Sequence, residues 1–376
     1  MSRGSPDVLV IGGGLHGCST ALHLARRGLA VTVVEKDHVG RHASGVNAGG
    51  VRRLGRHPAE IPLSVAAMEL WHSIRDLVDD DCGFESHGQV KVAESEAEFE
   101  ALRQRVESVR ALGFGHEELI GQTELRALVP AISDHCVGAI LSRGDGAALP
   151  YRTVLAFRRK AESLGARFVE GTRVTGLRRA GAVWRLETDR GALEAPVLVN
   201  AAGAWAGRIA EMLGEPVPLE AIAPMLMITA RMPPFLKPVL GATARPLSFK
   251  QFANGTVLIG GGHRGRAWPD ENRTELDFGK LAVSAQTVLD LFPIMRGAEI
   301  LRCWAGIEAR MPDDIPVIGP SATSEGVFHA FGFSAHGFQL GPIVGALIAE
   351  LVTMGRSNLP IAPFRVDRFG SNDRSR

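Results

Sequence analysis

Three glycines near the start of the chain constrain its fold more than any other feature. Gly12, Gly14 and Gly17 have the spacing G-x-G-x-x-G, and they directly follow a short apolar run over residues 8–11. Such a run is typical of a central parallel strand that is buried on both faces. Residues 15–28 then have the pattern of a helix that ends at a glycine. The segment therefore predicts a strand, a tight turn and a helix.

The next segment supplies an acidic residue where this motif needs one. A second apolar run over residues 30–34 ends in Glu35, 18 residues after Gly17. In such a βαβ unit the glycines allow a tight turn, close approach of a pyrophosphate and close helix packing, while the acidic residue binds a ribose. The acidic Glu35 argues against a 2′-phosphate, and the motif alone leaves NAD and FAD open. We predict a dinucleotide site whose further contacts include Leu15, His16 and Lys36.

Composition and charge are those of an ordinary globular chain. With 376 residues, the chain is long enough for two domains, or for one domain with a large insertion. The formal net charge of +1 gives no indication of a nucleic-acid partner. The 4 cysteines lie far apart without a C-x-x-C pair, so we expect neither a metal site nor an iron–sulfur cluster. We expect a reduced, cytoplasmic protein, with peripheral contact to a membrane as the alternative.

Two further loops consist largely of small or polar residues that can approach a flat ring. Residues 44–50 contain Ser, Asn, Ala and Gly, and residues 332–339 follow a predicted strand at 326–331. The second loop leads into a predicted helix from about Leu340 to Val352, whose N-terminus would direct its positive end to the same place. Both loops are also compatible with ordinary turns, because glycine-rich turns occur in any α/β protein.

Four segments resemble the D-amino-acid oxidase/sarcosine oxidase superfamily of FAD-dependent oxidoreductases, and they occur in that family's order. They are residues 44–52, 199–205, 304–319 and 332–342. Within the superfamily, residues 333–342 and Ser248-Phe249-Lys250-Gln251 resemble the amino-acid dehydrogenases and β-type subunits such as that of opine oxidase. The resemblance implies that the dinucleotide is FAD, with its ring between the loops 44–50 and 332–339.

The predicted fold is α/β, with a Rossmann-like FAD-binding domain and an α+β substrate domain on a mixed or antiparallel sheet. The cofactor motifs lie in three separated blocks, so the FAD-binding domain is predicted at residues 1–80, 140–215 and 315–370. Residues 81–139 and 216–314 would form the substrate domain, and residues 371–376 a frayed tail.

The resemblance also indicates which residues would hold FAD. Val174 stands where the family's backbone meets the adenine. Non-covalent FAD is favoured: the spacing after Cys303 differs from that of the family's covalent cysteine, and Asn47 replaces the histidine that carries the link in dimethylglycine dehydrogenases. The other implied contacts are Ser44, Asn47, Ala48, Gly49, Gly50, Ala202, Gly203, Trp205, Gly306, Gly332, Ser334, His336, Gly337, Phe338 and Gln339.

Four side chains are candidates for the chemistry. Arg52 stands where the family keeps a cation beside the ring, and His263 where sarcosine oxidases carry an active-site histidine. Glu308 replaces the arginine that grips the substrate carboxylate in glycine-oxidase-like members, so it would attract a substrate cation instead. Gln339 replaces a lysine that helps to bind the carboxylate. Three of these residues have a purely structural alternative. Arg52 would be a surface arginine, His263 a histidine in a hairpin turn, and Glu308 the partner of an ion pair with Arg302 or Arg310.

The predicted electron acceptor depends on one position. Ile259 stands where sarcosine oxidases have a lysine that promotes oxygen reduction. Without that cation the reduction of oxygen loses electrostatic help, so a dehydrogenase that passes electrons to a quinone or a protein is favoured over a strict oxidase.

The predicted function is the oxidation of a CH–NH bond of an amino acid or secondary amine by hydride transfer to flavin N5, which gives an imine. One alternative is an FAD-dependent 2-hydroxyacid dehydrogenase, in which His263 or His336 would take the hydroxyl proton. The other is an FAD-binding subunit of a heteromeric dehydrogenase, which would require a partner chain.

Overall fold

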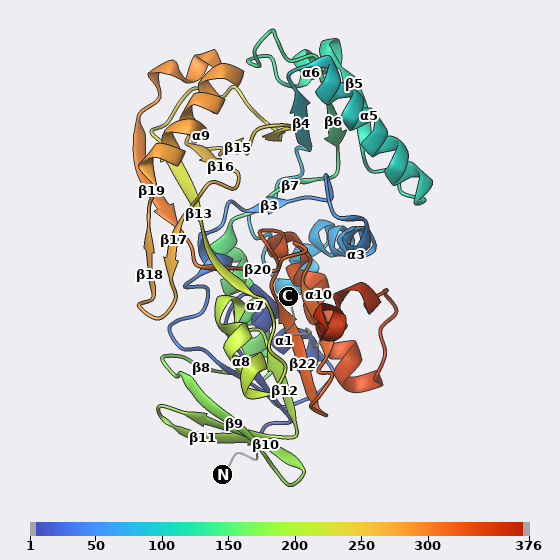
Figure 1. Cartoon of the computed structure of the whole chain (residues 1–376), viewed down its shortest axis with the longest axis vertical. Coiled ribbons are helices and arrows are strands. Elements are labelled where there is room, and N and C mark those ends of the chain that lie inside the picture. Colours follow the sequence, from blue (N-terminus) through green and yellow to red (C-terminus); the bar gives the residue numbers. More distant parts are fainter. Residues whose placement is uncertain (1–4, 371–376) are drawn as a thin grey trace, which may run out of the picture.

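The computed structural model describes residues 5–370, and one half of it is built on a six-stranded sheet around β1 (Val8–Ile11) (Figure 1). The strand order is β21-β22-β12-β1-β2-β8, and every neighbouring pair is parallel except β21 and β22. The other strands are β2 (Val31–Val34), β8 (Arg167–Val169), β12 (Val197–Asn200), β21 (Val317–Pro320) and β22 (Val327–Phe331). The predicted parallel, doubly covered sheet is confirmed.

The two faces of this sheet are covered differently, because successive side chains of a strand point to opposite sides. Val8 and Val10 pack with helices on one face, whereas Leu9 and Ile11 pack with Trp184 of a small antiparallel sheet on the other. The helices of the first face are α1 (Leu15–Arg26), α3 (Ile61–His72), α4 (Ile74–Val78), α7 (Pro150–Ser163) and α10 (Gly337–Met354). The second face carries α8 (Ala206–Met212), β9 (Val174–Ala180), β10 (Val183–Thr188) and β11 (Gly191–Ala195).

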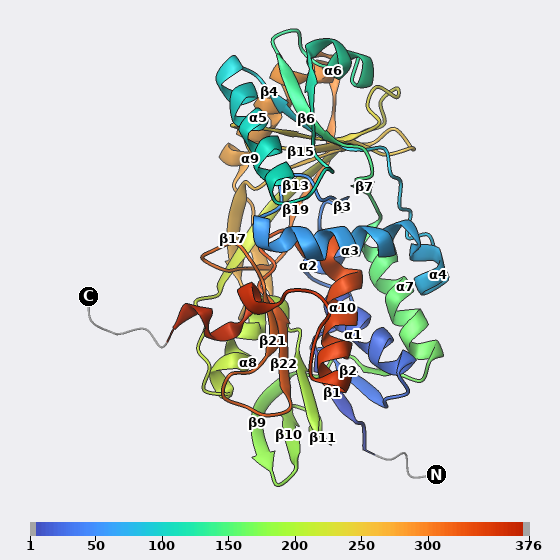
Figure 2. The ribbon, with the colours of Figure 1, turned by 90° about the vertical axis from the view of Figure 1, so that its right-hand side faces the viewer.

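The last long helix, α10, packs between α1 and α3 (Figure 2). It begins three residues before the predicted start at Leu340. Gly341 and Gly345 allow close approach, since a Cβ at either position would overlap Leu15 or Ser19 of α1. By length and composition α10 could cross a membrane, but 67% of it is buried in the protein, as a core helix requires.

The other half of the molecule is an 11-stranded sheet that is antiparallel except where β14 pairs with β4. Its strand order is β18-β17-β13-β16-β15-β14-β4-β6-β5, with β19 and β20 also paired to β13. The strands are β4 (Gln89–Ala93), β5 (Glu118–Gly121), β6 (Gly138–Ser142), β13 (Glu220–Thr229), β14 (Val239–Ala242), β15 (Ser248–Gln251), β16 (Val257–Gly260), β17 (Arg264–Trp268), β18 (Arg273–Glu275), β19 (Ile300–Ala305) and β20 (Glu308–Arg310). The helices beside it are α5 (Glu96–Ala111), α6 (Gln122–Leu128) and α9 (Phe278–Leu291).

One face of the strands β14, β15 and β16 packs on a hydrophobic core, and the other face is turned toward the six-stranded half of the molecule. Leu240, Phe249 and Ile259 face a hydrophobic cluster that includes side chains of α9. Because side chains alternate along a strand, Ser248 and Lys250 face the opposite way, toward the six-stranded half. This alternation decides which residues of the sheet can reach a ligand.

Short elements join the two halves. The predicted loop at 44–50 begins as a short helix, α2 (Ala43–Val46), and continues into β3 (Gly50–Val51), which pairs with β7 (Gly146–Ala147). Single turns of 3-10 helix occur at Pro58–Glu60, Gly203–Trp205, Pro293–Gly297, Ala362–Phe364 and Val366–Phe369.

The division into two domains stays a prediction. The strands of the six-stranded sheet lie within the predicted blocks 1–80, 140–215 and 315–370. β6 (Gly138–Ser142) belongs to the 11-stranded sheet and crosses the predicted boundary between residues 139 and 140. The predicted tail at 371–376 lies outside the described residues.

Candidate active site

A cavity of about 990 Å³ lies where the carboxyl ends of the parallel strands meet the large sheet. This is the edge at which open α/β sheets bind their ligands. The size is at the upper end of the range for small-molecule and cofactor sites. Its walls come from both halves of the molecule, so a ligand there would contact both.

Most of the predicted cofactor residues line this one cavity. Gly17, Ser334 and Gln339 do not line it. Those that do are Gly12, Gly14, Leu15, His16, Glu35, Lys36, Ser44, Asn47, Ala48, Gly49, Gly50, Val174, Ala202, Gly203, Trp205, Gly306, Gly332, His336, Gly337 and Phe338. The structure therefore brings together segments that are separated by up to 326 positions in the chain.

The glycine-rich turn has the geometry that close approach of a ligand requires. Gly12 has a φ of 109°, a value that favours glycine, and its missing Cβ would overlap the Ala201 carbonyl oxygen. A Cβ at Gly17 would overlap the Gly12 carbonyl oxygen, so Gly17 supports the turn from the helix side without lining the cavity. The Leu15 N–H donates to Ser44 Oγ at 2.9 Å and ties the turn to the neighbouring loop.

Glu35 braces the same turn. Its Oε2 accepts a hydrogen bond from the Gly13 N–H at 2.7 Å, and its Oε1 accepts one from the Asp37 N–H at 2.8 Å. Burial raises the pKa of Glu35, and the two backbone N–H groups counteract that shift in part. Because a carboxylate oxygen accepts more than one hydrogen bond, Glu35 can still bind a ribose from the cavity side.

The loop before α10 has a strained backbone that is held by its neighbours. Ser334 and Ala335 have φ values of 48° and 69°, which are uncommon for residues with a side chain. Ser334 Oγ accepts from the Met311 N–H at 3.0 Å, and the Ala335 N–H donates to Glu308 Oε1 at 2.7 Å. The hydrogen bond of Ser334 thus fixes the loop on the side away from the cavity, and the hydrogen bond to Glu308 fixes it on the cavity side.

Glu308 is the one predicted catalytic carboxylate, and it lines the cavity. Burial raises the pKa of Glu308 to about 7, although the Ala335 N–H and the charge of Arg264 act in the other direction. A carboxyl with a pKa near neutrality can take or give a proton at working pH. The structural alternative was an ion pair with Arg302 or Arg310, and within residues 5–370 neither arginine pairs with Glu308: Arg310 pairs with Asp314 and Glu220.

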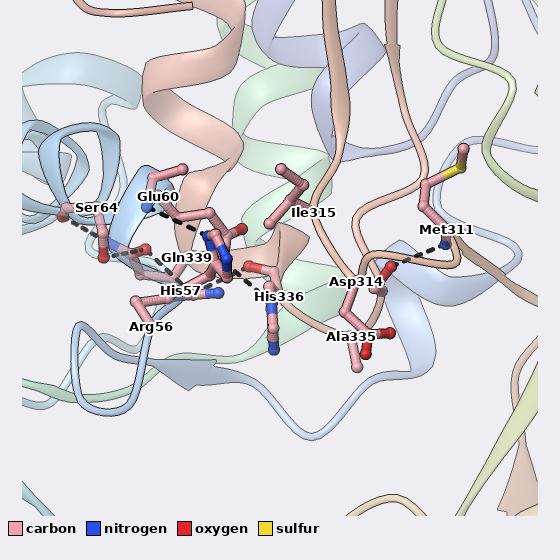
Figure 3. A network of polar contacts seen from close by, with 12 residues as sticks. Arg56, His57, Glu60, Ser64, Met311, Asp314, Ile315, Ala335, His336 and Gln339 are labelled. Carbon is pink, nitrogen blue, oxygen red and sulfur yellow. Dashed lines mark hydrogen bonds and ion pairs between the residues drawn. The ribbon is translucent and has the colours of Figure 1, made fainter. Parts of the chain in front are cut away.

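Beside this loop lies a buried polar network, shown in Figure 3. Arg56 Nη2 donates to the His336 carbonyl oxygen and to Gln339 Oε1, both at 3.1 Å. His336 Nδ1 lies 3.3 Å from Glu60 Oε2, and Glu60 is completely buried. Burial would raise the pKa of Glu60, but the hydrogen bond from His336 and the charge of Arg56 outweigh it and lower the pKa.

Gln339 belongs to this network and faces away from the cavity. Its Oε1 also accepts from Ser64 Oγ at 3.0 Å, and its Nε2 donates to the Ser64 carbonyl oxygen at 2.8 Å. Both ends of the amide are therefore engaged inside the protein, which argues against the predicted contact with a substrate carboxylate. His263 also lies outside the cavity wall, although its neighbours Gly262 and Arg264 line it.

Arg52 lines the cavity as predicted, with Nη1 donating to the Leu54 carbonyl oxygen at 2.5 Å. Sequence reasoning missed three charged residues near it: Arg56, Glu60 and Lys250. Arg56 lines the cavity, although its place in a run of arginines at 52, 53 and 56 is also typical of a surface segment. The alternation of side chains along Ser248–Gln251 could have identified Lys250, but no local pattern identifies Glu60.

Two single positions bear on the predicted acceptor and on the predicted non-covalent cofactor. Ile259 faces the cluster under α9, so the absence of a lysine there says nothing about charge in the cavity. Cys303 does not line the cavity and packs against the same cluster, and burial raises the pKa of its thiol. Its position supports non-covalent cofactor binding, because a covalent link requires a reactive thiolate within reach.

A family model described as FAD dependent oxidoreductase matches residues 7–351. The chain belongs to this family. It is therefore an FAD-dependent oxidoreductase, and the predicted superfamily and cofactor are confirmed. The cavity fits FAD, since the backbone of the glycine-rich turn at Gly12 and Gly14 lines it closely and Gly50 opens on free space beside the loop.

Relatives of this FAD-dependent oxidoreductase match over nearly the whole chain. Hydrogen cyanide synthase subunit HcnC of Pseudomonas aeruginosa is 28% identical over 96% of this chain and 96% of the relative. The beta subunit of sarcosine oxidase from Rhizobium meliloti is 27% identical over 96% of this chain and 88% of the relative. The crystal structure of L-proline dehydrogenase from P. horikoshii is 27% identical with a TM-score of 0.90, over 97% of this chain and 98% of that one. These relatives support oxidation of amino acids or amines as the general activity.

Proposed function

We propose that this FAD-dependent oxidoreductase oxidises the CH–NH bond of an amino acid or secondary amine to an imine. FAD supplies the acceptor for the hydride. The observation that carries the proposal is that the charged side chains lining the cavity include one carboxyl with a pKa near 7, Glu308, and the guanidinium groups of Arg52 and Arg56. An amino acid carries the complementary pair, an ammonium group and a carboxylate.

The roles follow from ordinary electrostatics. Arg52 would hold the substrate carboxylate, since a partly buried guanidinium binds carboxylates strongly. Glu308 would attract the substrate ammonium and take one proton from it, because hydride leaves the α-carbon only when the nitrogen lone pair is free. The Ala335 N–H bonded to Glu308 Oε1 leaves Oε2 for this proton.

The oxidation of a hydroxyacid is supported less well. That reaction needs a base for the hydroxyl proton, and one of its two predicted bases, His263, does not line the cavity. His336 lines it, but its Nδ1 is paired with Glu60. The alternative that this chain is one subunit of a heteromeric dehydrogenase has separate support, because two relatives are described as subunits.

The test is anaerobic mixing of the FAD-loaded chain with matched substrates, with the visible absorption of oxidised flavin as the readout. We expect bleaching with members of a panel of D-amino acids, prolines, N-methyl amino acids and opines. The corresponding hydroxyacids should give none. Bleaching with hydroxyacids alone would overturn the proposal, and bleaching only after a partner chain is added would assign the activity to a heteromeric enzyme.

A further inference from the structure

Two polar side chains of β4 face the cavity from the large sheet. Gln89 and Lys91 lie two residues apart on this strand, so they are on the same face, and both line the cavity. Val90 and Val92, on the opposite face, pack in the hydrophobic core. The neighbouring strand β14 places Gly241 opposite Lys91, and Gly241 also lines the cavity. Because β14 has no side chain at this position, space is left beside Lys91.

The Lys91 ammonium lies among cations rather than beside a carboxylate. Its residue is partly buried, and within residues 5–370 it forms no ion pair. Burial lowers the pKa of Lys91, and the charges of Arg52 and Arg105 lower it further. Glu117 and Glu98 act in the other direction, but Glu117 is held by Arg105 at 2.9 Å. An ammonium near other cations and away from water is costly without an anion, so its place here indicates a negatively charged ligand.

This end of the cavity holds more positive charge than one carboxylate can balance. Arg52 and Arg56 line the cavity together with Lys91, and within the described part of the chain neither arginine forms an ion pair. The charges of Glu60 and Asp145 act on both arginines, but Asp145 pairs with another arginine at 3.1 Å. Glu60 therefore offsets one of the three positive charges, and a substrate carboxylate on Arg52 would offset a second. The charge of Lys91 is left for another anion.

Gln89 supplies a second polar group at the same place. Its Oε1 is buried and has no hydrogen-bond partner among the described residues. A glutamine amide can turn about its last bond, so that either its oxygen or its two N–H donors face a ligand. An ammonium and an amide on the same face of one strand can together hold a carboxylate, through charge and through a directed hydrogen bond.

We propose that Lys91 and Gln89 form a subsite for a second carboxylate, so that the substrate is an amine or amino acid with two carboxylates. Arg52 would hold the carboxylate next to the carbon that is oxidised, and Lys91 the carboxylate at the far end of the substrate. This second carboxylate belongs either to an acidic side chain or to a carboxyalkyl group on the nitrogen, and the experiment separates the two. The inference rests on the proposed function, because it names the class of amine.

The first measurement is binding to the oxidised, FAD-loaded chain, so that it does not require oxidation. A ligand beside the flavin perturbs its visible absorption, and a titration gives the dissociation constant. Thiodiacetate and methylthioacetate carry a sulfur in place of the amine nitrogen and differ by one carboxylate. We expect the wild-type chain to bind thiodiacetate at least about tenfold more tightly, the effect of one hydrogen bond to a charged group.

Lys91→Met removes the charge and keeps most of the apolar part of the side chain. We expect it to weaken the binding of thiodiacetate about tenfold or more, and that of methylthioacetate by less than about threefold. Lys91→Arg should restore the difference, because it returns the charge. Lys237→Met, at an exposed lysine that does not line the cavity, is the matched control and should change neither constant.

Anaerobic bleaching of the flavin then locates the second carboxylate on the substrate. Faster bleaching by iminodiacetate than by sarcosine assigns it to the group on the nitrogen. Faster bleaching by an enantiomer of glutamate than by the same enantiomer of 2-aminobutyrate assigns it to the side chain. In either case we expect Lys91→Met to remove the difference within the pair.

Equal weakening of both sulfur ligands in Lys91→Met would overturn the proposal, since Arg52 and Lys91 would then hold one carboxylate together. So would a wild-type chain that does not prefer thiodiacetate, a measurement that needs no variant. Loss of FAD from both Lys91→Met and Lys91→Gln would also overturn it, because Lys91 would then serve the cofactor. A chain that prefers thiodiacetate as expected but is bleached by no amine would retain the subsite and reject the proposed oxidation of amines.

Discussion

Single side chains set the charge that the cavity presents to a ligand. The sequence indicated Arg52 and Glu308, because a resemblance to a family points to positions that lie beside a motif. It could not predict that Gln339 is enclosed by Arg56 and Ser64, since those contacts join positions 275 or more residues apart. Lys250 shows the same limit, because its place beside the loop at Gly49 follows only from the fold.

Glu308 should make the stability of the apoprotein depend on pH. Its pKa rises from 4.5 in the unfolded chain to about 7 in the folded one, so the folded state binds the proton more tightly. The stabilisation is complete below about 4.5 and is lost as the pH rises through 7. We expect the urea midpoint of Glu308→Gln to vary less than that of wild type across this window. Parallel curves for the two proteins would contradict the prediction.

Glu60 should contribute to stability through charge. Glu60 is completely buried, and its negative charge acts on the buried guanidinium of Arg56. Leaving a buried charge without its counter-charge typically costs about 3 kcal/mol or more. We expect Glu60→Gln to lower the free energy of unfolding by about 3 kcal/mol in urea. Glu69→Gln, on the exposed side of the same helix region, is the control and should change it by less than about 0.5 kcal/mol. A loss equal to that of the control would show that the charge of Glu60 is not needed.

At the level of elements, the strand-turn-helix unit is the part most fully predicted from the sequence. Its apolar run, glycine spacing and helix end are local, and local patterns determine such a unit. The short helix α2 within the second loop was not predicted, because four residues carry no periodic signal. Which side chains of β14, β15 and β16 face the cavity can be stated only once the pairing register of these strands is known.

Gly17 should be needed for cofactor binding without touching the cofactor. Gly17→Ala would place a Cβ on the Gly12 carbonyl oxygen and displace the turn. We expect the variant to be purified without FAD, or with an FAD dissociation constant raised at least tenfold, which corresponds to about 1.4 kcal/mol. Gly115→Ala, at an exposed glycine with open space around it and no left-handed backbone, is the control and should retain FAD. Normal FAD content in Gly17→Ala would refute this account of the turn.

At the level of the whole molecule, one cavity is walled by both sheets, so the cofactor should stabilise the chain as a unit. Saturation with FAD at 100 times its dissociation constant adds about 2.7 kcal/mol to the free energy of unfolding. We expect apoprotein to melt in one transition that shifts upward on addition of FAD. Riboflavin, which lacks the pyrophosphate and adenosine, should give a much smaller shift. Equal shifts for both ligands would place binding outside the Gly12 turn.

The fold class and the cofactor could be predicted from the sequence because they depend on segments that each carry their own pattern. The partner chain, the acceptor and the localisation depend on surfaces and distances that no segment specifies, and the domain boundaries stay predictions. The structure adds the side of the sheet on which each side chain stands, and it places Ile259 in the core rather than on the cavity side.

The most direct test of the central claim is the rate of anaerobic flavin bleaching by the best amine of the panel, compared with the same amine carrying deuterium on the α-carbon. Removal of a hydride from that carbon predicts bleaching several-fold slower for the deuterated amine, with a larger rate for both as Glu308 loses its proton near pH 7. Bleaching by the hydroxyacid with the same isotope sensitivity, and none by the amine, would contradict the account.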